Sequence, residues 1–62
     1  MNMEKIYNEI KQKISKEYLL YITKKNNESP FEYLISLIRN EYNIPKTSSY
    51  TIVEKLLEYY NI

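Results

Sequence analysis

The sequence predicts an all-helical domain, a small bundle of three to four helices. Apolar residues recur at helical spacing through most of the 62 residues, and no stretch shows the strict alternation typical of a strand. Helix-start signals interrupt this pattern at Ser29-Pro30 and in the hydroxyl-rich stretch after Pro45. A chain of this length forms one domain, and its single core only marginally offsets the conformational entropy of folding. Size alone therefore favours a partner or an oligomer.

The first predicted helix runs from about Met3 to about Lys24. Apolar side chains form one stripe along it, and charged side chains lie opposite. The stripe comprises Met3, Ile6, Tyr7, Ile10, Ile14, Tyr18 and Tyr21. After Lys16 the pattern becomes apolar nearly all round, because Leu19 and Leu20 fall outside the stripe. We expect this end of the helix to be buried between other elements.

The second predicted helix begins after the polar linker at residues 26–28. Ser29 is the N-cap, Pro30 has no N–H to lose at the first helical position, and Glu32 completes a capping box. The helix must end by Ile44, because the residue before Pro45 disfavours helical geometry. Its apolar residues cover a wide arc, so it should pack against more than one neighbour: Phe31, Leu34, Ile35, Leu37, Ile38 and Tyr42.

The third predicted helix begins between Ser48 and Thr51, where several hydroxyls could cap it. Thr51 and Glu54 have the spacing of a second capping box. Apolar side chains then cover about half of the circumference: Tyr50, Ile52, Val53, Leu56, Leu57, Tyr59 and Tyr60. The chain contains no glycine, so asparagine must supply the left-handed residues that end helices. We expect Asn26, Asn43 and Asn61 in this role.

The composition disfavours several classes of function. Histidine, cysteine and aspartate are absent, which removes disulfides, zinc clusters, thiol chemistry and the usual general base. The Lys46-Thr47-Ser48 turn lacks the glycines of a phosphate-binding loop. We expect no catalytic residue, metal or cofactor. The chain lacks a run of about 18 apolar residues and an amino-terminal secretory pattern, so we also expect a cytoplasmic protein that does not enter membranes.

Charge is distributed unevenly along the chain. Residues 1–25 carry six lysines against three glutamates, whereas the remainder carries three basic residues against five glutamates. A basic front half could follow phosphates of a nucleic acid. The candidate residues are Lys11, Lys13, Lys16, Lys24, Lys25 and Lys46. Glu4, Glu9 and Glu17 interrupt the row and the net charge is only +1, so a solvated helix face is the favoured alternative.

The chain carries eight tyrosines, a residue type that is enriched in protein interfaces. The favoured interpretation for any one of them is a core position with the hydroxyl at the edge of the core. Tyr33 lies near the polar side of its helix, so it is the aromatic residue that we most expect to be exposed, together with Tyr59 or Tyr60 at the carboxyl end. The predicted partner-binding residues are therefore Tyr33, Tyr59, Tyr60 and Ile62.

Several of these segments together resemble the YozE-type domain. They are Tyr18-Leu19-Leu20, the polar linker, Ser29-Pro30 and, most specifically, Ile44-Pro45-Lys46-Thr47-Ser48 leading into Tyr50 and a helix that finishes Leu57-Glu58. The resemblance covers roughly residues 16–60. It divides the single domain into an amino-terminal helical extension, residues 1–15, and a YozE-like region, residues 16–62. Family members usually continue into a further helix, which the extension could replace.

The resemblance implies a sterile-alpha-motif-like fold of the kind found in small proteins of low-GC Gram-positive bacteria. It brings no catalytic residues, because such domains are usually interaction modules for protein and less often for nucleic acid. Related small proteins are encoded on mobile genetic elements near replication genes, including one for a DNA polymerase. The first hypothesis is therefore an accessory protein that binds a larger replication protein. A nucleic-acid-binding accessory protein and a self-associating structural module are the alternatives.

Overall fold

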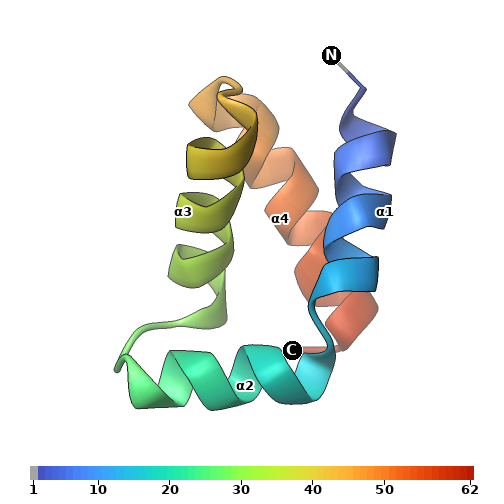
Figure 1. Ribbon diagram of the computed structural model, residues 1–62. Helices are drawn as coiled ribbons and strands as arrows, with labels where there is room; N and C mark the ends of the chain where they lie inside the picture. The colour runs from blue at the N-terminus through green and yellow to red at the C-terminus, as the bar shows by residue number, and fades with distance from the viewer. Residues whose placement is uncertain (1) are drawn as a thin grey trace.

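The computed structural model describes residues 2–62, and within them the chain forms four helices and no strand. The helices are α1 (Met3–Lys13), α2 (Lys16–Lys25), α3 (Pro30–Tyr42) and α4 (Lys46–Tyr60). In Figure 1, α4 runs between α1 and α3, while α2 lies across one end of these three helices. The predicted all-helical bundle is confirmed.

The single helix expected from Met3 to about Lys24 is wrong, because the chain breaks between α1 and α2. Ile14 is extended, with φ −124° and ψ 113°, and the Ser15 hydroxyl accepts a hydrogen bond from the Tyr18 N–H at 3.1 Å. In one straight helix, Ile14 and Leu19 would lie about 140° apart around the axis. The break lets both side chains enter the same core.

The expectation that the second half of this segment is buried all round is also wrong. Leu19 is fully buried, but Tyr18, Leu20 and Tyr21 remain 47%, 44% and 60% exposed. The cause is the position of α2 at the end of the bundle, where the other helices cover only one of its sides. Periodicity counts apolar residues but does not reveal how many neighbours a helix has.

The predicted start of α3 is confirmed in detail. The Ser29 hydroxyl accepts a hydrogen bond from the Glu32 N–H at 3.1 Å, and the Glu32 carboxylate accepts one from the Ser29 N–H at 3.2 Å. The helix ends at Tyr42, before Ile44 as expected, and Asn43 takes the left-handed conformation with φ 49°. This capping box fixes where α3 begins relative to the linker.

The start of α4 differs from the prediction. The helix begins at Lys46, directly after Pro45, and no side chain caps it. The hydroxyls of Ser49 and Thr51 lie inside the helix and donate to the carbonyl oxygens of Pro45 and Thr47, at 3.2 Å each. Proline already has the backbone angle that leads into a helix, so the chain turns earlier than the hydroxyls suggest.

Left-handed asparagines end helices in this glycine-free chain, as expected for two of the three predicted positions. Asn43 and Asn61 have φ values of 49° and 61°. Asn26 has φ −89° instead, and its neighbour Asn27 takes the left-handed conformation with φ 54°. Asparagine tolerates this region better than most residues, because its short polar side chain can hydrogen-bond locally.

One core joins all four helices. It consists of Ile6, Ile10, Ile14, Leu19, Leu34, Ile38, Ile44, Ile52, Val53, Leu56 and Tyr60. Three of these come from α1 or from the residue that follows it, although α1 precedes the region that carries the family resemblance. Residues 3–14 are therefore an integral part of the packed domain.

Candidate functional site

A groove of about 540 Å³ lies between α1 and α4. Its lining residues are Met3, Glu4, Tyr7, Thr51, Ile52, Lys55, Glu58 and Tyr59. Helical spacing explains the lining: Met3 and Tyr7 are one turn apart on α1, and Ile52, Lys55 and Tyr59 follow one edge of α4. The neighbouring edge of α1 carries the buried residues Ile6 and Ile10.

Two large apolar side chains remain exposed within this groove. Met3 is 38% exposed and Tyr59 is 55% exposed, whereas Ile52 is buried. Charged groups of both signs, Glu4 and Lys55 among them, line it as well. An exposed apolar strip between charged residues is the usual composition of a protein-binding surface.

Aromatic contacts hold Tyr59 in place. Its ring meets the Tyr7 ring edge-to-face, with centroids 6.4 Å apart and an interplanar angle of 79°. The Lys11 ammonium lies over both rings, 4.4 Å from the Tyr7 centroid and 4.8 Å from the Tyr59 centroid. The Tyr60 ring also meets the Tyr59 ring edge-to-face, with centroids 5.1 Å apart. The exposed ring of Tyr59 is therefore ordered before any partner arrives.

Tyr60 anchors the corner between α1 and α2. Its side chain is 4% exposed, and its hydroxyl donates a 2.5 Å hydrogen bond to the carbonyl oxygen of Ile14. Burial raises the pKa of the Tyr60 phenol, and the neighbouring Tyr59 and Tyr7 add to the rise. The expectation that Tyr60 lies on an exposed partner-binding surface is wrong, because its ring fills the core beneath that surface.

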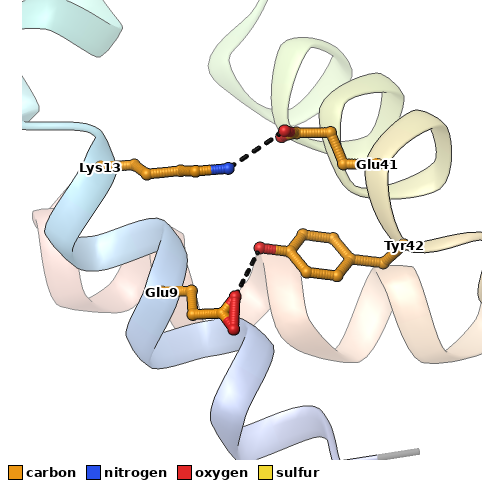
Figure 2. Close-up of polar contacts among 4 residues, drawn as sticks. All are labelled: Glu9, Lys13, Glu41 and Tyr42. Carbon is orange, nitrogen blue, oxygen red and sulfur yellow. Dashed lines mark hydrogen bonds and ion pairs between the residues drawn. The ribbon is translucent and has the colours of Figure 1, made fainter.

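Two polar contacts tie α1 to the carboxyl end of α3, as Figure 2 shows. The Tyr42 hydroxyl donates to the Glu9 carboxylate at 3.1 Å, and the Lys13 ammonium pairs with the Glu41 carboxylate at 3.0 Å. Burial and then the bond to Glu9 raise the pKa of Tyr42. The bond to Glu41 raises the pKa of Lys13. Glu9 and Lys13 lie on the side of α1 opposite Tyr7 and Lys11, so these contacts hold α1 against α3 on the side away from Tyr59.

The remaining predicted partner-binding residues lie in different environments. Ile62 is exposed, close in sequence to Tyr59 at the end of α4. Tyr33 is half-buried, and burial followed by the nearby Tyr18 raises its pKa. The expectation that Tyr33 is exposed is wrong in this respect, and Tyr21 and Tyr59 are exposed instead. Tyr59 is thus the one predicted residue that lines the groove.

Sequence reasoning did not assign Met3 and Tyr7 to a binding surface. Both belong to the apolar stripe of the first predicted helix and were expected in the core. Met3, Tyr7 and Lys11 follow one another at intervals of four residues, which indicates that one edge of α1 carries both apolar and charged side chains. Only the position of α4 shows that this edge borders a groove.

The six lysines predicted to contact nucleic acid do not form one row. Lys13 pairs with Glu41, and Lys11 lies over two tyrosine rings. Lys46 stands over the Tyr50 ring, 5.6 Å from its centroid, at the start of α4, and that end of α4 lies far from α2 in Figure 1. The other three, Lys16, Lys24 and Lys25, all lie on α2.

The described part of the chain offers few features of other kinds of site. No group of three or more metal-ligating side chains occurs among residues 2–62. Every buried polar side-chain atom in this range has a hydrogen-bond partner. None of the four helices combines the length and the apolar composition needed to cross a bilayer.

Comparison of the chain with models of protein families, with curated proteins and with solved structures finds no significant match.

Proposed function

We propose that this chain is a non-catalytic accessory protein that binds a larger protein through the α1–α4 groove. The observation that supports this most is the joint exposure of Met3 and Tyr59 in a groove of about 540 Å³. A small domain has few apolar side chains to spare from its core. Two of these side chains are exposed in the same groove, which indicates that a partner covers this surface.

The contacts that restrict the Tyr59 side chain support the same proposal. Tyr7, Lys11 and Tyr60 all contact the Tyr59 ring, so little side-chain freedom is left to lose on binding. Pre-ordered aromatic side chains bind with a smaller entropic cost, and tyrosine is enriched among residues that dominate binding energy. The groove therefore suits an apolar side chain or a short segment of a partner protein.

The kind of partner comes from the YozE-type resemblance alone. That resemblance favours a sterile-alpha-motif-like arrangement of residues 16–62, with the Ile44-Pro45 turn between α3 and α4. It points to a DNA polymerase or another replication protein of a mobile genetic element as the partner to test first. In this proposal α1 replaces the further helix of the family and supplies half of the groove.

The experiment is affinity capture from host lysate, with and without nuclease in parallel. The captured partner is identified and purified, and its binding to the chain is then measured by calorimetry. Tyr59→Ala should reduce binding of that purified partner about thirtyfold, since truncating a residue that dominates binding energy costs about 2 kcal/mol and about 1.4 kcal/mol corresponds to tenfold. Tyr21→Ala is the matched control, because Tyr21 is at least as exposed as Tyr59 but lies on α2. Circular dichroism would verify that both variants remain folded.

Two results would contradict the proposal. The groove is the wrong surface if Tyr59→Ala binds the purified partner as tightly as the unmodified chain does. An accessory role toward a protein is wrong if every captured protein disappears on nuclease treatment.

A further inference from the structure

We propose that the outer face of α2 binds single-stranded nucleic acid, independently of the groove. This outer face consists of Lys16, Glu17, Tyr18, Leu20, Tyr21, Lys24 and Lys25, all of which are exposed. Most of this face lies at the end of the bundle and is turned away from the other helices, while Tyr18, at its edge, lies near Tyr33 of α3. The side turned toward them buries Leu19 and Thr23.

The charge of α2 fits a polyanion. Three lysines and a single glutamate, Glu17, occur in its ten residues. The one ion pair formed within residues 2–62 joins Lys13 and Glu41, neither of which belongs to α2. The ammonium groups of α2 are therefore free to meet phosphates, whereas the charge of Lys13 is already compensated.

Aromatic rings on the same face distinguish the single strand from other polyanions. Tyr18, Tyr21 and Lys25 follow one another at intervals of three and four residues, which places them on one side of the helix. The Lys25 ammonium lies 6.0 Å from the Tyr21 centroid, so a cation and an exposed ring are neighbours. Unpaired bases stack on such rings, while phosphates contact the adjacent lysines.

Other occupants use only part of this surface. A duplex keeps its bases stacked inside and would leave the tyrosine rings without a partner. An acidic peptide matches the lysines but offers no flat bases to the rings. The combination of free ammonium groups and exposed tyrosines therefore favours an unpaired strand.

The test is fluorescence anisotropy of a labelled oligothymidylate with the full chain at increasing salt. Contacts from three lysines predict a slope of log affinity against log salt of about −2. Replacing Lys24 and Lys25 with glutamine should weaken binding about tenfold or more at low salt, and should make the slope shallower by about 1.4. The matched control replaces Lys46 and Lys55, which removes the same charge from α4, and should change affinity less than about twofold.

A second variant examines stacking separately from charge. Tyr21→Leu keeps an apolar side chain at an exposed position and should weaken binding about fivefold or more, with the salt slope unchanged. Tyr59→Ala should bind the oligonucleotide normally, which separates this surface from the groove. Circular dichroism would check that each variant is folded.

Four results would overturn the inference. They are an absence of binding at low salt, an equal loss of affinity in the α4 control, full affinity of Tyr21→Leu, and competition by polyglutamate that equals competition by unlabelled oligothymidylate. The last result would assign α2 to an acidic protein instead.

Discussion

Removing the Tyr60 hydroxyl tests how the corner between α1 and α2 is held. Tyr60→Phe keeps the buried ring but leaves the Ile14 carbonyl oxygen without the hydrogen bond that it accepts across 46 residues of sequence. A buried polar group that loses its partner costs about 1–3 kcal/mol. A domain of this size has a total stability of roughly 3–9 kcal/mol, so the loss is a large share.

Thermal and urea unfolding followed by circular dichroism would measure this loss. A destabilisation of about 2 kcal/mol should lower the melting temperature by roughly 8–16 °C in so small a domain. Tyr59→Phe is the matched control, because Tyr59 is the exposed neighbour and its ring contacts survive the change. We expect the control to stay within about 0.5 kcal/mol. The reasoning is refuted if the two variants lose equal stability.

Three further predictions concern the core, a cap and alkaline pH. Leu34→Ala should destabilise the domain by about 2–5 kcal/mol, because Leu34 is fully buried; a smaller loss in urea unfolding would contradict the described core. Ser15→Ala should cost about 0.5–2 kcal/mol by removing the cap of α2, and an unchanged melting temperature would show that the cap is unimportant. Burial raises the pKa values of Tyr33, Tyr42 and Tyr60 in the folded chain above the ordinary value of 10.0. As the pH rises, the unfolded chain therefore loses these phenolic protons at a lower pH than the folded chain does. Stability should therefore be full below about pH 10 and decrease above it, and melting curves that stay unchanged to about pH 11 would contradict this linkage.

The candidate groove was predictable only in part. Tyr59 stood out as an aromatic residue near the end of a helix, and it is exposed there. Tyr60, its neighbour, has the same residue type and the same local pattern, yet it is buried. A helix turns by about 100° per residue, so adjacent side chains face different surroundings, and only the neighbouring helices decide which is covered.

Local sequence determined the helical class and the sharpest helix boundary. Ser29, Pro30 and Glu32 satisfy backbone groups within one turn, so their effect does not depend on the rest of the molecule. The same kind of signal at Ser15 was hidden, because the apolar stripe continued across it without a proline or glycine.

Tertiary packing decided the break after α1, the exposure of α2 and the groove between α1 and α4. The break exists because Ile14 and Leu19 both gain burial in one core, and this gain comes from residues far away in sequence. Hydrophobic burial is non-directional and depends on what covers a side chain, whereas capping depends on the next few residues. The sequence alone therefore determined where helices could form, and only the folded structure decided which of their faces remain free to bind.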